Sequence, residues 1–500
     1  MVLYKIKARD LDKIPFALGY ADVRLISSKQ AQILPNEIDL TTNLTKNITM
    51  KIPFISAAMD TVTESEMAIK MALMGGIGVI HKNLSPEKQA EEIAKVKRFR
   101  SGVITNPITV SPEFPIEEVI RIKKTLGFKS IPVTEDGKPT GKLIGAISDN
   151  DYSEKKHANL KVRDRMSPLE KLLVASHMIS LEEAEDLLLE NKMRKLLLVD
   201  ENGYLRGMVT KTDIEKGEEY PNATLDKFER LRVGAAIGGP GQDLEVRVPK
   251  IVEAGVDVIF IDTSQGFSAG VERTIDYIKR NYDFVDIVAG NIDNSEAVKF
   301  LIEKEVHAIK VGIGPGTICT TTDVTGAGVP QLTAVYDCVR IGEKFEMPVI
   351  ADGGIVSPGQ LVFPLAVGAS SIMSGKLFAG TDECPGAIKE IVDRKGVGHS
   401  VKEYRGMGSL EAMLKGSKSR YFQEGMKLED LVVQGKEVVV PYIGPVAKQI
   451  RKLVNDLKFS LAIHCGVRAL RDLRNGDAEF AILPRPAYSK EDLFLFERKE

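Results

Sequence analysis

Short runs of β-branched and other apolar residues alternate with helix-like stretches over much of the chain. Two runs, PFISAAMD from Pro53 and GGIGVIH from Gly75, flank the helix-like segment ESEMAIKMALM. Six more runs follow residue 225, and they begin near Arg232, Val256, Asp286, Ala308, Pro348 and Ser370. Repeated βα units predict a parallel sheet, and eight of them predict an α/β fold of the (β/α)8 TIM-barrel type.

The first two βα units are separated from the other six by a segment with its own internal repeat. The copies start at Asn106 and Glu170, and each has the order strand, helix, strand, acidic-Gly turn, strand. Each copy ends in a hydroxyl residue followed three positions later by Asp: Ser148 with Asp151, and Thr210 with Asp213. We therefore expect barrel segments at 1–100 and 223–500, and an inserted domain at 101–222 with modules at about 101–155 and 162–220.

Composition favours small-molecule chemistry over nucleic-acid or membrane binding. The 500 residues are 43% hydrophobic and 28% charged, and 68 basic against 70 acidic residues give a formal net charge of -2. Such a balance creates no general field that attracts nucleic acid or acidic lipid. The N-terminal segment lacks the apolar core of a signal peptide, and no apolar run is long enough to span a bilayer, so we expect a cytoplasmic protein.

One of the four cysteines stands in a sequence that suits a nucleophile. Cys338, Cys384 and Cys465 have no CxxC or zinc-ligand spacing, so disulfides and structural zinc are not predicted and each is expected to be a small buried residue. Cys319 instead follows the sixth predicted strand in the glycine-rich segment KVGIGPGTICTT. Glycines allow a tight loop whose amides favour the thiolate, so Cys319 is the candidate nucleophile.

Carboxylates stand at two further strand ends, where functional groups of such barrels gather. Asp262 follows the fourth strand, and Asp352 lies in a DGG sequence after the seventh. No GxGxxG is placed between a strand and a helix, so a separate dinucleotide-binding domain is not indicated. The GxSxG match at Gly266 to Gly270 would suggest a serine hydrolase with His399 or His464 as base, but Ser268 lies too far beyond its strand for a nucleophile elbow.

Together these segments resemble the family of inosine 5'-monophosphate (IMP) dehydrogenase and GMP reductase. GIGPGTICTT followed by GAGVPQLTAV carries the resemblance, with SAAMDTVTE, IDTSQG, AGN, ADGGI and EYRGMGSLEAM elsewhere in the chain. The resemblance covers nearly the whole sequence. The inserted repeat resembles a tandem pair of CBS modules, the Bateman domain.

The resemblance implies an NAD-dependent oxidation of IMP to xanthosine 5'-monophosphate, a step of guanine nucleotide biosynthesis. Cys319 would form a covalent bond to the purine, after which the Arg420-Tyr421 pair of a mobile flap, at about 400–440, would enter the vacated NAD site. With Thr321, these two residues would position and activate the hydrolytic water. An arginine base is chemically unusual because its pKa lies above about 12.

The resemblance also implies binding roles, position by position. Substrate contacts would be Met59, Thr317, Asp352, Gly353, Gly354, Ser374, Gly375, Tyr404, Gly406, Met407, Gly408 and Gln434. Cofactor contacts would be Asp262, Thr263, Ser264, Asn291, Lys310, Gly312 and Gly314. Carbonyls of Gly314, Gly316 and Cys319 would form half of a potassium site, and Ser148, Asp151, Thr210 and Asp213 would hold a regulatory adenine or guanine nucleotide.

Departures from the family pattern keep alternatives open. Position 317 is Thr where the family usually has Ser, and Met373-Ser374-Gly375-Lys376 replaces the usual Met-Gly-Ser or Met-Gly-Asn. The family's C-terminal glycine segment, which completes the potassium site of a neighbouring subunit, is not recognisable. A homotetramer is expected from the resemblance, and the alternatives are an NADPH-dependent GMP reductase and a purine-nucleotide-binding protein without turnover.

Overall fold

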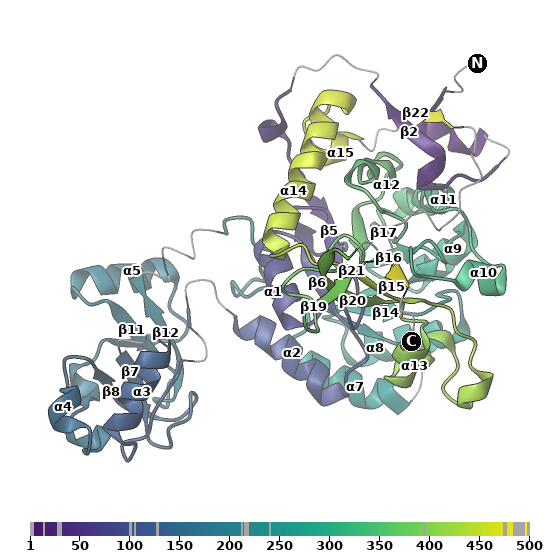
Figure 1. The fold of residues 1–500 in the computed structure, drawn as a ribbon. Helices are drawn as coiled ribbons and strands as arrows, with labels where there is room; N and C mark the ends of the chain where they lie inside the picture. The colour runs from purple at the N-terminus through teal and green to yellow at the C-terminus, as the bar shows by residue number, and fades with distance from the viewer. Residues whose placement is uncertain are drawn as a thin grey trace. The chain divides into compact units, whose positions relative to one another are not determined.

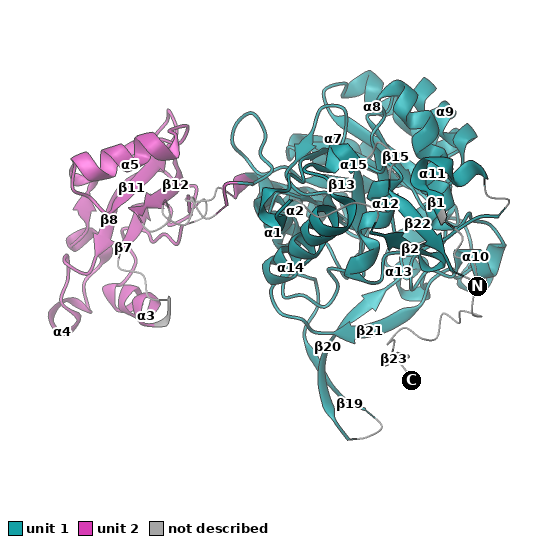
Figure 2. Cartoon of the chain, turned by 90° about the horizontal axis from the view of Figure 1, so that it is seen from above, with its two compact units in different colours: residues 1–97, 222–500 teal, residues 98–221 magenta. Residues whose placement is uncertain are grey.

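The computed structural model describes most of the chain, in two compact units. The described residues are 5–13, 16–27, 33–99, 103–104, 107–126, 130–211, 214, 220–239, 242–393, 396–473, 478–483 and 496–497. One unit contains residues 1–97 and 222–500, and the other contains residues 98–221 (Figure 2).

Eight parallel strands form a closed barrel in the first unit (Figure 1). They are β5 (Phe54–Ser56), β6 (Ile77–Ile80), β13 (Gly234–Ile237), β14 (Val258–Asp262), β15 (Asp286–Ile292), β16 (Ala308–Val311), β17 (Val349–Asp352) and β18 (Ser371–Ser374). Neighbours follow chain order from β13 to β18, and β18 then pairs with β5, β5 with β6 and β6 with β13. The predicted (β/α)8 fold is confirmed, and all eight predicted runs supply its strands.

Helices cover the outside of the barrel because the strands bury both faces. They are α1 (Ser65–Leu73), α2 (Pro86–Arg98), α7 (Gln242–Glu253), α8 (Ala269–Asn281), α9 (Ser295–Glu303), α11 (Gln331–Gly342), α12 (Val362–Ala366) and α14 (Val446–Phe459). The contact between α1 and β6 is close: a Cβ added at Gly78 would lie 2.5 Å from the Ala68 Cα. Glycine at position 78 therefore allows this helix to approach the strand.

A short hairpin closes the amino-terminal end of the barrel. Its strands β3 (Thr42–Asn43) and β4 (Thr49–Met50) pair antiparallel, and Leu44, Ile48 and Met50 join the core cluster that fills the barrel. Asn47 Nδ2 donates to Asp286 Oδ1 at 2.8 Å, at the first residue of β15. With this end filled, the opposite end, where the strands terminate, is left for a binding site.

Further elements surround the open end and the side of the barrel. β20 (Gly398–Arg405) pairs with β19 (Lys389–Val392) and β21 (Glu437–Pro441), and β21 also pairs with β23 (Phe496–Glu497). The segment between β20 and β21 contains α13 (Leu410–Leu414). β22 (Glu479–Ile482) pairs with β1 (Lys5–Lys7) and β2 (Val23–Ile26), while α10 (Thr321–Thr325) and α15 (Leu470–Leu473) are short helices.

The second unit contains two three-stranded sheets and three α-helices within its described residues. Its sheets contain β7 (Ser130–Thr134), β8 (Leu143–Ser148) and β9 (Ser167–Pro168), and β10 (Val174–Ser176), β11 (Lys195–Val199) and β12 (Leu205–Thr210). α3 (Ile116–Leu126) precedes β7, α4 (Glu154–His157) follows β8, and α5 (Leu181–Glu190) lies between β10 and β11. That this unit is a CBS pair stays a prediction.

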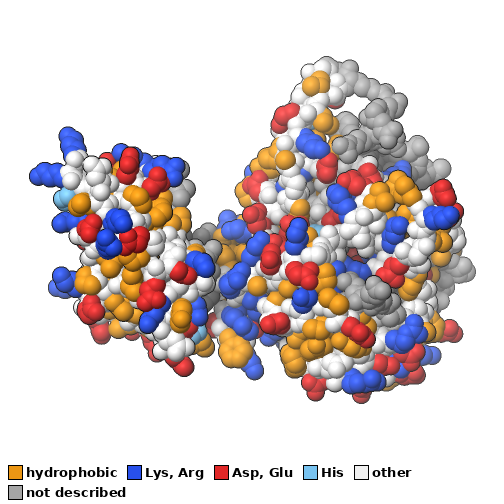
Figure 3. Space-filling view, turned by 90° about the horizontal axis from the view of Figure 1, so that it is seen from below, with side chains coloured by type: hydrophobic (Ala, Val, Ile, Leu, Met, Phe, Trp, Pro, Cys, Tyr) orange, Lys and Arg blue, Asp and Glu red, His pale blue; other side chains and the backbone are white. Residues whose placement is uncertain are grey.

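Charge on the surface is mixed, as its composition requires. Acidic and basic side chains are interspersed on the face of the barrel unit that Figure 3 shows. Within the described residues, no helix combines the length and the apolar character needed to cross a membrane. The cytoplasmic location stays a prediction.

A buried ion-pair cluster joins the two places where the chain leaves and re-enters the barrel unit. Lys97 Nζ lies 3.0 Å from Asp226 Oδ2 and 2.8 Å from Asp257 Oδ2, and all three side chains are less than a tenth exposed. Lys97 ends the first barrel segment and Asp226 lies near the start of the second. The two crossing points are therefore close together without the inserted unit.

Replacing residues 98–221 by a short Gly/Ser linker should leave a folded barrel, because the Lys97–Asp226 pair already brings the ends together. Circular dichroism and a single cooperative thermal transition would show this. The same deletion with Lys97→Ala should melt at a markedly lower temperature, since Asp226 and Asp257 lose the buried cation between them and keep only Arg230 and Arg232. If the deletion protein that keeps Lys97 is aggregated or unfolded, the barrel does not fold without residues 98–221.

Candidate active site

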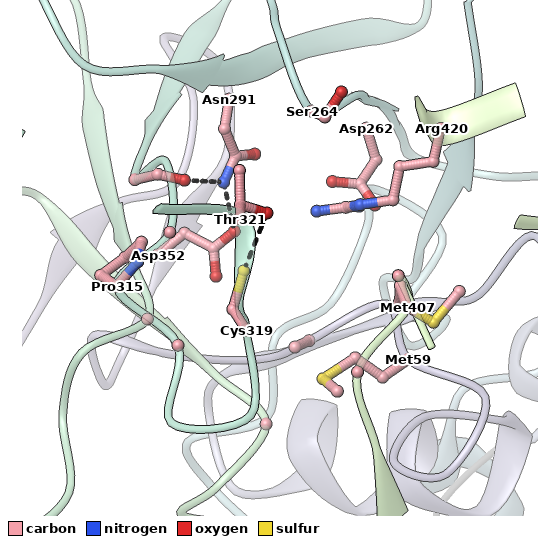
Figure 4. A pocket seen from close by; sticks show the side chains of 18 of the residues that line it. Met59, Asp262, Ser264, Asn291, Pro315, Cys319, Thr321, Asp352, Met407 and Arg420 are labelled. Atoms are coloured by element: carbon pink, nitrogen blue, oxygen red, sulfur yellow. Dashed lines mark hydrogen bonds and ion pairs between the residues drawn. The ribbon is translucent and has the colours of Figure 1, made fainter. Parts of the chain in front are cut away.

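A polar pocket opens at the carboxyl ends of the barrel strands. The empty space in it, with the open space at its mouth included, is about 860 Å³. Figure 4 shows that Cys319, Asp352, Asn291, Asp262 and Arg420 face one another within it. Sequence-predicted residues on its wall are Met59, Asp262, Thr263, Ser264, Asn291, Lys310, Gly312, Gly314, Gly316, Cys319, Thr321, Asp352, Gly353, Gly375, Tyr404, Gly406, Met407, Gly408, Arg420, Tyr421 and Gln434.

The buried ammonium of Lys310 organises the floor of this pocket. Lys310 is 1% exposed, and its Nζ donates to Asp262 Oδ1 at 2.8 Å and to Asp352 Oδ2 at 2.7 Å. It also donates to the side-chain oxygen of Asn291. These residues come from the adjacent strands β14 to β17, so the barrel register itself brings them together. One cation between two carboxylates leaves an excess negative charge here.

Asn291 completes the connection between the two carboxylates. Its Nδ2 donates to Asp352 Oδ2 at 2.9 Å and to the Gly312 carbonyl at 2.6 Å (Figure 4). Since its amide oxygen accepts from Lys310, both ends of the amide are used. Asp352 is thereby held with its carboxylate facing the pocket, 16% exposed.

The Cys319 loop is pinned from two sides. Cys319 N donates to the Gly316 carbonyl at 3.1 Å, and Thr320 N donates to the Gln434 carbonyl at 3.0 Å. Cys319 also forms an isolated bridge with Gly435, so the segment 434–436 runs antiparallel to the loop. The thiol points into the pocket and donates to Thr321 Oγ1 at 3.2 Å. A partly exposed sulfur on a fixed loop suits nucleophilic attack on a bound ligand.

The predicted flap segment reaches into the pocket. Arg420, 18% exposed, forms an ion pair with Asp262 Oδ2, the oxygen that Lys310 does not contact. The Arg420 carbonyl accepts from Ser264 N at 2.9 Å, and its guanidinium lies 6.0 Å from the Tyr421 ring centre. Burial raises the pKa of Tyr421. Arg420 thus pairs with the carboxylate that the resemblance assigned to the cofactor.

A buried bidentate ion pair anchors the segment that carries the predicted substrate contacts after β20. Arg405 Nε donates to Asp60 Oδ1 at 3.0 Å and its NH2 group donates to Asp60 Oδ2 at 2.8 Å. The third guanidinium nitrogen pairs with Glu411 at 2.7 Å. Because both Asp60 and Arg405 are less than a tenth exposed, this pair fixes the EYRGMG segment against the loop after β5.

Three predicted phosphate contacts do not line the pocket wall. The Thr317 hydroxyl is buried and has no hydrogen-bond partner among the described residues, which suits an oxyanion acceptor arriving with a ligand. Ser374 Oγ instead accepts from Leu377 N at 3.2 Å. A Cβ at Gly354 would lie 3.2 Å from the Tyr20 ring, and one at Gly375 would lie 2.9 Å from Tyr404 Oη. Close packing therefore requires glycine at both positions.

Some residues around the pocket were not assigned from the sequence. Gln331 Nε2 donates to the Val311 and Asp352 carbonyls, at 2.9 and 3.1 Å, and so braces the ends of β16 and β17. Lys82 and Asn83 follow β6 directly and lie beside Arg420 in a small adjoining cavity. The rule that functional groups follow barrel strands would have selected these two.

The other cysteines and the GxSxG serine have structural surroundings. Cys338, Cys384 and Cys465 are buried, and burial raises the pKa of Cys338 and Cys384. The Ser268 hydroxyl caps α8 by accepting from Val271 N at 3.3 Å. His399 contacts Asp393 and His464 contacts Ser27, so these contacts do not form a triad with Ser268.

In the inserted unit, the first predicted pair of nucleotide contacts, Ser148 and Asp151, is hydrogen-bonded within the unit itself. Asp151 Oδ2 accepts from Ser148 N at 2.6 Å and Ser148 Oγ at 2.7 Å, and its other oxygen accepts from Ser167 at 3.1 Å. Thr210 ends β12, whereas Asp213 lies outside the described residues. A nucleotide would have to exchange with these serine hydrogen bonds at Asp151.

Comparisons with known proteins agree with this geometry. A family model described as IMP dehydrogenase / GMP reductase domain matches residues 17–490. The chain is 45% identical to the inosine-5'-monophosphate dehydrogenase of Bacillus subtilis over 463 residues, covering 93% of this chain and 92% of that protein. It is 44% identical to the Helicobacter pylori enzyme of the same name over 462 residues, covering 92% and 93%.

Among solved structures, this chain is similar to a variant of GMP reductase from Trypanosoma brucei in complex with guanosine 5'-monophosphate. The similarity covers 95% of this chain and 96% of that chain. The TM-score is 0.81 and the sequence identity is 33%. The match to the family model and the identity to these relatives both extend across the barrel and the segment inserted in it. This chain therefore belongs to the IMP dehydrogenase / GMP reductase family.

Proposed function

We propose that this protein oxidises IMP to xanthosine 5'-monophosphate with NAD, through a covalent bond to Cys319. The pairing of Arg420 with Asp262 carries the proposal, because it brings a flap residue into the site predicted for the cofactor. An enzyme that must hydrolyse an intermediate after hydride transfer needs such an exchange. The relatives named inosine-5'-monophosphate dehydrogenase support the same choice.

Cys319 would act first, as a thiolate that forms a bond to C2 of the purine. The C2 hydrogen then leaves with its electron pair as hydride, for which NAD is the acceptor, and this restores the C2–N3 double bond. Water subsequently adds at C2 and the sulfur leaves, which regenerates Cys319 and gives the 2-oxo product. Asp352 at the pocket floor would accept hydrogen bonds from the substrate ribose diol.

The negative cluster around Lys310 suits a cation in the space beside Asp262. Two carboxylates share one ammonium there, and Arg420 supplies a second positive charge when the flap is in the pocket. The oxidised nicotinamide is also cationic, whereas the reduced ring is neutral. Loss of that charge on hydride transfer would favour replacement of the cofactor by Arg420.

The flap residues and Thr321 would then handle the water. Thr321 Oγ1 lies 3.2 Å from the Cys319 sulfur, and Tyr421 and Gln434 line the same pocket. Arg420 would orient the water and assist its deprotonation, while Tyr421, whose pKa is raised by burial, stays a neutral hydrogen-bond donor. Gln434 holds the cysteine loop through its backbone.

The buried Thr317 hydroxyl, the Gly354 and Gly375 backbone and Tyr404 would surround the phosphate. Tyr404 is also kept neutral, because burial and the nearby Asp352 raise its pKa. Lys376, half-buried after β18, offers a positive charge at the same strand end. Gly354 follows β17, and Gly375 and Lys376 follow β18, which are the strand ends that usually form the phosphate site of such barrels.

Potassium, a regulatory nucleotide and a homotetramer complete the proposal. Carbonyls of Gly314, Gly316 and Cys319 would hold potassium and steady the cysteine loop, although the Gly316 carbonyl already accepts from Cys319 N. No cluster of three or more His, Cys, Asp or Glu side chains suited to a metal occurs in the described parts of the chain. The pair of modules at 98–221 would bind an adenine or guanine nucleotide.

GMP reductase is the second candidate, because the solved structures of that enzyme are similar to this chain. The two activities differ in their substrates. With IMP and NAD, the absorbance of NADH should appear. With GMP and NADPH, the absorbance of NADPH should stay constant. The opposite pattern would identify a GMP reductase. Binding of purine nucleotides without either activity would favour a binding protein without turnover.

Changing Cys319 to Ser should abolish NADH formation while IMP binding persists, because a serine hydroxyl is a far weaker nucleophile than a thiolate. A loss of at least about 10³-fold is expected. Cys338→Ala is the matched control and should affect stability alone, since Cys338 is buried in α11. Retained activity in Cys319→Ser would remove the nucleophile assignment.

Changing Arg420 to Ala should slow hydrolysis without abolishing hydride transfer. Rapid mixing should then show a burst of about one equivalent of NADH per site, followed by turnover slowed about 10² to 10⁴-fold. Mass spectrometry of quenched enzyme should detect the nucleotide attached to Cys319. If the burst disappears, or if turnover is unchanged, Arg420 does not serve the hydrolytic step.

A further inference from the structure

A small cavity adjoins the main pocket on the other side of Arg420. It lies between the loop after β6 and the flap, and its wall consists of Ala58, Lys82, Asn83, Ile237, Asp262, Met407, Ser417 and Arg420. The space suffices for about one water molecule. Cys319 does not line this cavity, so it is distinct from the place where the substrate would react.

Two residues on the wall of this cavity carry complementary polar atoms that are buried without partners. Arg420 Nε is a hydrogen-bond donor and Asn83 Oδ1 is an acceptor, and neither has a hydrogen-bond partner among the residues that the structure describes. Buried polar groups are nearly always satisfied, either by protein atoms or by ordered water. A donor and an acceptor on the wall of one water-sized space can be satisfied together by a single bridging water.

The orientation of the Asn83 amide is set by its other contacts. Its Nδ2 donates to Asp60 Oδ2 at 3.0 Å and to the Ala412 carbonyl at 3.1 Å. Both partners are acceptors, so a flipped amide would place oxygen against oxygen. The amide oxygen is thereby left to the cavity, and the buried Arg405–Asp60 pair holds the whole arrangement in place.

We propose that Asn83 is a positioning residue, which holds the closed flap by binding a water between its Oδ1 and Arg420 Nε. The role rests on the proposed function, in which Arg420 serves hydrolysis. Asp262 contacts one terminal nitrogen of the guanidinium, and the water contacts Nε. Two contacts at different nitrogens fix the plane of the guanidinium, which lies beside Asp262 at the pocket (Figure 4).

A double-mutant cycle tests whether Asn83 acts through Arg420. In the parent enzyme, Asn83→Ala should leave the NADH burst unchanged and slow hydrolysis of the Cys319 adduct about 10- to 100-fold, the range for a misplaced catalytic group. In the Arg420→Ala enzyme, the same change should have no further effect on hydrolysis. Equal slowing in both backgrounds, a lost burst, or unchanged hydrolysis in the parent would overturn the role.

Asn47→Ala provides the matched control. Asn47 also donates its amide to a carboxylate, Asp286, but at the closed end of the barrel. The Asn47→Ala substitution should lower the melting temperature without changing the rate of hydrolysis. The control therefore distinguishes the general effect of losing an asparagine hydrogen bond from an effect that acts through the flap.

The water itself can be observed independently of activity. A crystal structure of the parent protein with Arg420 on Asp262, at a resolution that places waters, should show one water within hydrogen-bond distance of both atoms. An empty cavity, or a direct Asn83–Arg420 contact, would overturn the water site. If the protein produces no NADH from IMP, the proposed function fails, whereas this crystallographic result still decides the water site.

Discussion

The arrangement of the site depends on the buried Lys310 ammonium. Asp262, Asn291, Lys310 and Asp352 are the last or next-to-last residues of four neighbouring barrel strands, and the lysine contacts the other three side chains. Removing the cation would leave two buried carboxylates facing each other, a strongly unfavourable arrangement. The lysine therefore acts from beneath the pocket, as a support for the two carboxylates, while these present their other oxygens to ligands.

Asp262 links this support to the moving part of the proposed mechanism. One of its oxygens stays with Lys310, and the other is taken by Arg420 in the present structure. In our account the cofactor and the flap use this second oxygen in turn, so they compete. The Arg405–Asp60 pair and the backbone contacts of Gln434 hold the flap's two ends, which lets a short central segment exchange without disturbing the Cys319 loop.

The sequence predicted the barrel because each strand is a distinct apolar run separated by helical segments, and strand ends then located Cys319, Asp262 and Asp352. Contacts that depend on rotamers and packing were not predictable in the same way. No local pattern indicates that Arg420 meets Asp262 or that Gln331 braces the Asp352 backbone. Lys82 and Asn83 also lie just beyond a strand, but no glycine-rich motif marks their segment, and it was not predicted.

Competition between Arg420 and NAD for Asp262 is the central claim, and a binding titration tests it most directly. In the inactive Cys319→Ser protein with IMP bound, the NAD dissociation constant can be measured with Arg420 present and with Arg420→Ala. The account predicts tighter NAD binding without Arg420, because the carboxylate no longer has a competing cation. Unchanged or weaker binding would contradict the claim that the flap and the cofactor share this carboxylate.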